Sequence, residues 1–203
     1  MKYVYALLAF ALIGVLNAAE EKKGKISVLV AGFGGQGALF SGKVIAHGGV
    51  IEKRYVSWIP SYGPEMRGGT ANCGVILSDQ PIGSIMVETP DVLIAMNRPS
   101  LDKFESAVVS GGIIVVDSSL IDRKVERTDV QTYYVPATKM ANDMGIPKMA
   151  NLILLGAVFK KTGCIKEETI KEAIDEMLPA KKKKFFGKNM MAIEAGMKAV
   201  ENN

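Results

Sequence analysis

A short apolar run followed directly by a glycine cluster, ISVLVAGFGGQG at residues 26–37, most narrowly limits the folds open to this chain. Its first half, Val28 to Ala31, is apolar at every position, which is typical of a strand buried on both faces of a parallel sheet. The glycines that follow permit a tight turn with positive φ and a close approach to the backbone. From Gln36 to His47 the pattern is helical. Strand, glycine turn and helix in this order begin a βαβ unit, whose helix N–H groups point back over the turn.

The remaining chain alternates between strand and helix patterns. The first strand spans residues 25–32, and apolar runs predict others over residues 54–58, 72–77, 82–87 (a short antiparallel return), 91–96, 113–116 and 131–135. Helical periodicity predicts helices over residues 36–48, 100–109, 138–144, 148–161, 166–178 and 189–200. We expect Gly48 and Gly49 to break the first helix and Pro60 to end the second strand. Ser100 is expected to cap the helix over residues 100–109. This alternation predicts an α/β fold whose mostly parallel sheet is covered on both faces.

Size and charge set further bounds. The chain has 203 residues, of which 48% are apolar, enough for one sizeable α/β domain. Its net charge of +4 owes much to Lys181–Lys184 and Lys188. A nucleic-acid binder more often interleaves basic and aromatic residues along one face, so no nucleic-acid partner is expected. The lysine run is either a solvated face or a docking site for an acidic partner, and exposed charges steer association more than they fix it.

The residues that usually carry catalysis or bind metals are scarce. Cys73 and Cys164 are the two cysteines, and no CxxC pair exists, which excludes a cluster held by four thiolates of this chain. Both are expected to be buried apolar residues. His47 is the single histidine and has no paired Ser or Cys nucleophile near it in sequence. We therefore predict neither a metal site nor a self-contained catalytic set on this chain.

The N-terminus has a different composition from the rest. Lys2 precedes the apolar run Tyr3 to Leu16, and Asn17-Ala18-Ala19 leads into charged residues. This order resembles a secretory signal, and the run is short for a membrane span, which needs about 20 apolar residues. An uncleaved anchor and a mis-assigned start codon are the alternatives. We therefore expect an extension over residues 1–24 and a globular domain over residues 25–203, with membrane contact only if the extension is retained.

The glycine cluster could be a dinucleotide fingerprint. GFGGQG at residues 32–37 fits the G-x-G-x-x-G spacing. That fingerprint also requires an acid at the end of the following strand, which binds the ribose. The second predicted strand ends in SWIP at residues 57–60, and Glu52 precedes that strand. NAD binding is therefore disfavoured, while an anion cradle and close packing against another chain remain open.

A second loop is expected beside the first. Residues 61–69, SYGPEMRGG, follow the second strand, and loops at the carboxyl ends of parallel strands gather at one edge of the sheet. Tyr62, Glu65 and Arg67 would bring a hydroxyl, a carboxylate and a guanidinium to that edge; the alternative is a solvated loop in which Glu65 pairs with Arg67. Asn97 closes another buried strand. The predicted cofactor-binding surface comprises Gly32, Gly34, Gly35, Gln36, Gly37, Ser61, Tyr62, Gly63, Glu65, Arg67, Gly68, Gly69 and Asn97.

Five segments in a fixed order carry a family likeness: GFGGQG, SYGPEMRGGTANC, PDVLIAMN, GGIIVVDSS and MANLILLGA. Together they resemble the gamma subunit of 2-oxoacid:ferredoxin oxidoreductases, which act on 2-oxoglutarate, pyruvate or branched-chain 2-oxoacids. The likeness runs from about Lys25 to the C-terminus and leaves out the N-terminal extension. It implies a Rossmann-like three-layer αβα domain with C-terminal helices.

The resemblance also implies a function within an assembly. Such enzymes decarboxylate a 2-oxoacid on thiamine diphosphate with Mg, pass electrons through iron–sulfur clusters to ferredoxin, and give the acyl group to coenzyme A. The implied partners are alpha, beta and ferredoxin-like delta subunits or their fused equivalents. They would hold the cofactors, since the reactive carbanion belongs to the cofactor. This chain would help to form the coenzyme A side, where Arg67 could meet a phosphate or carboxylate bidentately and Tyr62 and Glu65 could position it.

Two functions therefore stand at the sequence level. The first is a gamma subunit in the cytoplasm, where ferredoxin-dependent enzymes are expected although the signal-like extension conflicts with that location; overall likeness favours 2-oxoglutarate as substrate. The second is a stand-alone Rossmann-like module that binds a nucleotide or another anion without catalysis.

Overall fold

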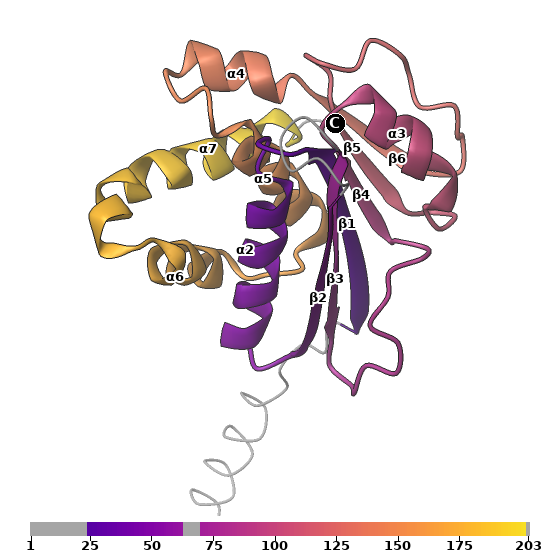
Figure 1. The fold of residues 1–203 in the computed structure, drawn as a ribbon, viewed down its shortest axis with the longest axis horizontal. Helices are drawn as coiled ribbons and strands as arrows, with labels where there is room; N and C mark the ends of the chain where they lie inside the picture. The colour runs from indigo at the N-terminus through magenta and orange to yellow at the C-terminus, as the bar shows by residue number, and fades with distance from the viewer. Residues whose placement is uncertain (1–23, 63–69, 202–203) are drawn as a thin grey trace, which may run out of the picture.

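The computed structural model describes residues 24–62 and 70–201, which form a six-stranded sheet with helices on both faces (Figure 1). The strand order is β2-β3-β1-β4-β5-β6. The strands are β1 (Lys25–Phe33), β2 (Tyr55–Tyr62), β3 (Thr70–Ser78), β4 (Val92–Ala95), β5 (Ile113–Asp117) and β6 (Gln131–Val135). Only β3 runs against the others, because it pairs antiparallel with both β1 and β2, while the pairs from β1 through β4 and β5 to β6 are parallel. The predicted α/β fold with a mostly parallel sheet is thus confirmed.

The helices are divided unequally between the two faces. They are α2 (Ala38–Ile51), α3 (Arg98–Phe104), α4 (Ala137–Asp143), α5 (Ala150–Thr162), α6 (Glu167–Met177) and α7 (Phe186–Ala199), with short 3₁₀ segments at Glu105–Ala107 (η1) and Ala180–Phe185 (η2). In Figure 1, α2, α5, α6 and α7 stack on one side of the sheet and α3 lies on the other. The three-layer architecture is therefore the one that the resemblance implied.

Successive side chains of the central strands point to opposite faces of the sheet and pack into two separate hydrophobic cores. Val28 and Val30 of β1 point into the larger core with α2, α5, α6 and α7, while Leu29 and Ala31 point into the smaller core with α3. All four are at most 5% exposed. Burial on both faces explains why the first strand is apolar at every position instead of alternating. The helix α5 is likewise buried at every position from Asn151 to Phe159, which agrees with its apolar side chains on all sides.

The expected helix break at Gly48 and Gly49 is wrong. Helix α2 continues to Ile51, and both glycines are buried contact points in it. A Cβ at Gly49 would lie 2.5 Å from Leu77 Cδ2, and one at Gly48 would lie 3.1 Å from Ile165 Cγ2. These glycines let the helix pack closely against β3 and the loop before α6, and that packing outweighs their low helix propensity.

Two further strand predictions are wrong, namely the end of the second strand and the strand over residues 82–87. Pro60 does not end β2, because β2 is an edge strand and proline is tolerated where a ladder bond is not required. Residues 82–87 form no strand. Instead, the segment packs over the open face of β2 and β3, where the Ser57 hydroxyl donates to the Ile85 carbonyl and Val87 contacts Gly74. Side-chain packing across the sheet, without a ladder, accounts for this difference.

The C-terminal region begins its last helix early. Residues 180–185 form the 3₁₀ segment η2, and α7 starts at Phe186, three residues before the predicted Asn189. Gly163 ends α5 in the left-handed conformation (φ 57°). The predicted extension before Gly24 lies outside the described residues. Within residues 24–62 and 70–201, no helix is both long and apolar enough to cross a bilayer.

Both cysteines are buried, as predicted. Burial raises the pKa of the Cys73 thiol from 9.0 to about 12. Because the folded pKa lies above the unfolded value, the thiol's contribution to stability is full below pH 9 and is lost as the pH rises towards 12. We expect Cys73 to react with iodoacetamide at pH 8–9 only as fast as the chain opens, measured by mass spectrometry. Alkylation at the rate of a free thiol would contradict this.

Candidate functional site

The register of the sheet places the ends of β1 and β2 at one edge. Phe33, the last residue of β1, pairs with Thr70, and Tyr62, the last residue of β2, pairs with Ala71. The two predicted loops therefore do leave from the same edge of the sheet. Ser61 and Tyr62, predicted in the second loop, belong to β2 instead. The candidates that follow them, at positions 63, 65, 67, 68 and 69, lie outside the described residues.

Gln36 ties the glycine turn to the neighbouring turn after β4. Its side-chain Oε1 accepts hydrogen bonds from Phe33 N (2.6 Å) and Asn97 Nδ2 (3.0 Å), and its Nε2 donates to the Met96 carbonyl (3.2 Å). One amide thus bridges the ends of β1 and β4, which are adjacent parallel strands. Gln36 and Asn97, both predicted binding residues, lie side by side and hold the edge in shape.

Two of the turn glycines are required by the chain's own side chains. A Cβ at Gly32 would lie 2.9 Å from Gln36 Oε1 and 3.0 Å from Met96 Cβ. A Cβ at Gly37 would lie 2.8 Å from the Asn151 amide, and Gly37 also has φ +87°. The close approach that the glycines permit is therefore made here from within the domain. Gly35 differs, because it has φ +99° but is exposed, with nothing within 4 Å of its Cβ position.

The sequence analysis missed Asn151, which anchors the turn from the other side. Its Nδ2 donates to the Gly37 carbonyl (3.3 Å) and to Ser41 Oγ (3.1 Å), and Ser41 Oγ donates to the Asn151 carbonyl (3.4 Å). Asn151 is 5% exposed. The sequence did contain a signal for Asn151, because it is an amide at the start of a helix that is otherwise apolar. A buried polar group must find hydrogen-bond partners, so such a residue indicates a specific contact.

Asp117 is a second buried residue at this edge that sequence reasoning passed over. It ends β5, is 2% exposed, and accepts hydrogen bonds from Thr138 Oγ1 (2.6 Å), Thr138 N (3.3 Å) and Ser119 N (3.1 Å). These three donors satisfy the carboxylate from within the chain. Asp117 therefore fixes the start of α4 at the same edge of the sheet.

Among residues 24–62 and 70–201, no side chain caps the N–H groups at the start of α2. Gly37 is the N-cap in the left-handed conformation, and the first turn of α2 contains no acidic residue. The N-terminal end of a helix carries a partial positive charge. Gly35, two residues before this N-cap, is exposed, so the described part of the edge presents an electropositive backbone surface.

Asn97, and not Ser100 as predicted, is the N-cap of α3. Asn97 is extended (φ −155°, ψ 164°), and its Oδ1 accepts from Ser100 N at 2.9 Å. The helix thus begins at Arg98, with Pro99 in its first turn, where a missing N–H costs nothing. Asn97 serves two turns at once, because the other end of its amide donates to Gln36.

We expect Asn97→Ala to lower the free energy of unfolding by about 1–2 kcal/mol, since it removes a cap and a bond to Gln36. Asn97→Asp keeps the capping oxygen but replaces the Nδ2 donor with an acceptor facing Gln36 Oε1. Urea denaturation of both variants separates the two roles. Equal stability of Asn97→Ala and the natural chain would contradict this account of the edge.

Elsewhere the described part of the chain offers little chemistry. His47 pairs with Glu176 (2.7 Å) and so joins α2 to α6 at the surface. Among residues 24–62 and 70–201, no group of three or more His, Cys, Asp or Glu side chains could hold a metal ion. The edge formed by the glycine turn, the end of β2 and Asn97 remains the candidate site.

Comparison with known sequences assigns nearly all of the described residues to one protein family. Residues 27–199 match the family described as pyruvate ferredoxin/flavodoxin oxidoreductase. The ketoisovalerate oxidoreductase subunit VorA of Methanothermobacter thermautotrophicus is 41% identical over 181 residues, which cover 88% of this chain and 37% of that protein. The 2-oxoglutarate synthase subunit KorC of Methanocaldococcus jannaschii is 31% identical over 172 residues, which cover 83% of this chain and 90% of that protein. The chain thus spans little more than a third of VorA and most of KorC.

Solved structures give the same result. The gamma subunit of a keto/oxoacid ferredoxin oxidoreductase from Geobacter sulfurreducens superimposes with a TM-score of 0.75 at 28% identity, covering 88% of this chain and 99% of that one. The 2-oxoglutarate:ferredoxin oxidoreductase from Magnetococcus marinus, with 2-oxoglutarate, coenzyme A and succinyl-CoA bound, gives a TM-score of 0.80 at 25% identity, covering 91% of this chain and 32% of that one. The chain therefore belongs to the pyruvate ferredoxin/flavodoxin oxidoreductase family, of which it is a gamma-type domain.

Proposed function

We propose that the chain is the gamma subunit of a thiamine-diphosphate-dependent 2-oxoacid:ferredoxin oxidoreductase, which converts a 2-oxoacid to an acyl-CoA and reduces ferredoxin. The observation that carries the proposal is the match with KorC, which extends over 90% of that subunit and over 83% of this chain. A match over nearly the whole length of KorC favours the same place in the assembly.

The geometry supports a role at the edge of the sheet. Gln36 and Asn97 lock the turns after β1 and β4 together, and Asn151 holds the base of the glycine turn. The exposed Gly35 and the uncapped start of α2 then present a rigid backbone surface to a neighbouring subunit or an anionic group. In the proposed enzyme, this surface helps to form the coenzyme A side of the active site.

The cofactors of the proposed enzyme belong to its other subunits. Thiamine diphosphate with Mg supplies the reactive carbanion when bound, and iron–sulfur clusters carry the electrons. Iron–sulfur clusters are held by several cysteine thiolates, whereas this chain has two cysteines that are both buried in its core. Among the described residues, the site offers backbone and amide groups, which position other groups and do not carry the reaction.

The substrate is proposed to be 2-oxoglutarate, as in the KorC relatives. Ketoisovalerate is the second candidate, favoured by the 41% identity to VorA. The common gamma subunit of Thermococcus litoralis is described as serving both pyruvate and ketoisovalerate oxidoreductases. A shared gamma subunit fits the view that partner subunits form the pocket for the substrate side chain.

The proposed location is the cytoplasm, where ferredoxin and thiamine-dependent enzymes meet. Mass spectrometry of the natural protein's N-terminus tests this part separately. A protein that begins near Ala19 or Glu20 and is recovered from an exported fraction would contradict it.

Affinity purification of the tagged chain from its natural host tests the proposed function. We expect it to co-elute with subunits that contain thiamine diphosphate and iron–sulfur clusters, measured by cofactor extraction and visible absorption. The same preparation should reduce ferredoxin with 2-oxoglutarate or ketoisovalerate in the presence of coenzyme A. A lone chain that elutes with a bound nucleotide would instead identify a stand-alone binding module.

A further inference from the structure

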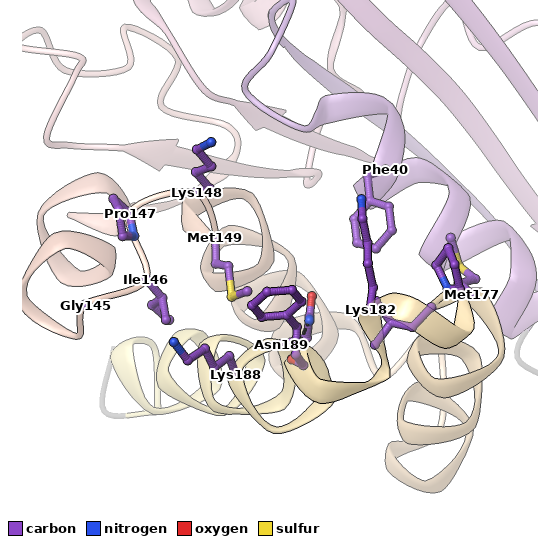
Figure 2. Close-up of a pocket in the computed structure, with 13 residues that line it drawn as sticks. Phe40, Gly145, Ile146, Pro147, Lys148, Met149, Met177, Lys182, Lys188 and Asn189 are labelled. Carbon is purple, nitrogen blue, oxygen red and sulfur yellow. Dashed lines mark hydrogen bonds between the residues drawn. The ribbon is translucent and has the colours of Figure 1, made fainter.

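A pocket of about 470 Å³ lies on the helical side of the domain, away from the strands (Figure 2). Its walls come from the first turn of α2, the loop between α4 and α5, the end of α6, η2 and the start of α7. In Figure 2, Phe40, Met149 and Met177 reach it from three of these elements. The apolar lining consists mainly of Phe40, Ile146, Met149, Met177, Leu178 and Phe185. We call this hollow the α2–α7 pocket.

Three lysines, Lys148, Lys182 and Lys188, also line the α2–α7 pocket, and no Asp or Glu does. All three are exposed, and none forms a salt bridge with a residue in the described part of the chain. Lys183, by contrast, pairs with Asp175 at 2.6 Å, outside the lining. The apolar hollow therefore has a rim of positive charge that the domain does not neutralise.

We propose that the α2–α7 pocket docks an acidic segment of a partner protein that inserts apolar side chains between carboxylates. A volume of about 470 Å³ leaves room for large apolar side chains, and the flexible thioethers of Met149 and Met177 adapt to such anchors. The three lysines come from three different elements, the α4–α5 loop, η2 and α7. Charges spread around the mouth suit several carboxylates on one peptide better than a single small anion.

The lining disfavours nucleic acid as the occupant. Bases stack on flat aromatic faces, and single-strand binders place several such faces along a basic groove. Four of the six main lining side chains are aliphatic or thioether groups, namely Ile146, Met149, Met177 and Leu178. Anchors of a protein segment match this surface better. Of the lysine run in the sequence, Lys182 is therefore assigned to docking, not only to solvation.

The length of the fused relatives indicates that further polypeptide accompanies this domain. The matched region covers 37% of VorA and 32% of the Magnetococcus marinus chain, so most of each of those chains lies beyond it.

Phe40 and Met149 connect the pocket to the glycine turn, because they lie in the first turn of α2 and at the N-cap of α5. The docking proposal goes beyond the proposed function and needs no enzymatic activity to be tested.

Site-specific photo-crosslinking in the natural host provides the test. The photoreactive residue p-benzoylphenylalanine replaces Phe185, which is 36% exposed in the pocket wall, or as a control Met191, which is 41% exposed on α7 outside the lining. After irradiation of the full-length protein in cells, the crosslinked peptide is identified by mass spectrometry. The Phe185 probe should yield a protein segment rich in Asp and Glu that contains aliphatic or aromatic residues, and the Met191 probe should not yield that segment.

A charge-reversal pair then checks the role of the rim. Lys182→Glu with Lys188→Glu should reduce the crosslink from position 185 about tenfold, because rim charges steer association. The matched pair Lys25→Glu with Lys198→Glu makes the same change in net charge at exposed positions outside the pocket and should leave the crosslink unchanged. Circular dichroism confirms folding of all variants. A neutral or basic crosslinked segment, a nucleic-acid adduct, no crosslink at position 185, or equal loss in both pairs would each overturn the proposal.

Discussion

Gly196→Ala is expected to lower the free energy of unfolding by at least about 3 kcal/mol. Helices α5 and α7 cross at their glycines, since a Cβ at Gly196 would lie 1.8 Å from the Ile153 carbonyl oxygen and one at Gly156 would lie 2.0 Å from the Ile193 carbonyl oxygen. The obstacle is backbone in both cases, so no side chain can turn aside. The two helices would have to separate, opening the larger core. Urea denaturation of the purified chain measures the loss.

Gly187→Ala is the matched control, because Gly187 lies in the same helix α7 with nothing within 4 Å of its Cβ position. It should be neutral or more stable by up to about 1 kcal/mol, the helix-propensity gain of alanine over glycine. Gly156→Ala combined with Gly196→Ala should cost less than the two single changes added together, since the first already separates the helices. A Gly196→Ala chain as stable as the Gly187→Ala chain would show that the crossing is not tightly packed.

Gly37→Ala is expected to cost about 2–4 kcal/mol at the candidate site, from the strain of φ +87° and from overlap with Asn151 at 2.8 Å. Gly35→Ala provides the comparison, because Gly35 has φ +99° but open space at its Cβ position. It should cost only the strain, about 1–2 kcal/mol. Both are measured by urea denaturation. The excess for Gly37 isolates the contact between the turn and α5.

A second variant distinguishes the two causes. Asn151→Ala in the Gly37→Ala background removes the overlapping amide and should recover part of the loss, although it also leaves Ser41 and the Gly37 carbonyl without that donor. Equal losses for Gly35→Ala and Gly37→Ala would mean that Asn151 does not press against the turn. The prediction concerns the purified domain and therefore stands apart from the proposed activity.

The sequence predicted the fold well where local pattern and tertiary environment agree. The run at β1 is apolar at every position because both faces are buried, and α5 is apolar all round for the same reason. The sequence pattern gave a wrong prediction where contacts with residues distant in the sequence determine the local structure. Gly48 and Gly49 look like a helix break, yet Ile165 and Leu77 pack closely against the helix there. No local rule contains that information.

The candidate site was predicted in outline and not in its details. The shared edge of the two loops followed from strand direction alone, and the register confirms it. The reason for glycine at positions 32 and 37 could not be predicted, because it depends on Gln36, Met96 and Asn151 meeting the turn in space. A polar residue such as Asn151 inside an apolar helix is the signal most worth following in such a sequence.

The central claim is that this chain is a required subunit of a 2-oxoacid:ferredoxin oxidoreductase. The direct measurement is coenzyme-A-dependent reduction of ferredoxin, assayed with 2-oxoglutarate, ketoisovalerate and pyruvate in extracts of the natural host with the gene deleted and then restored. We predict that activity with at least one of the three 2-oxoacids is lost on deletion and returns when the full chain is restored. Unchanged activity with all three 2-oxoacids after deletion would contradict the claim.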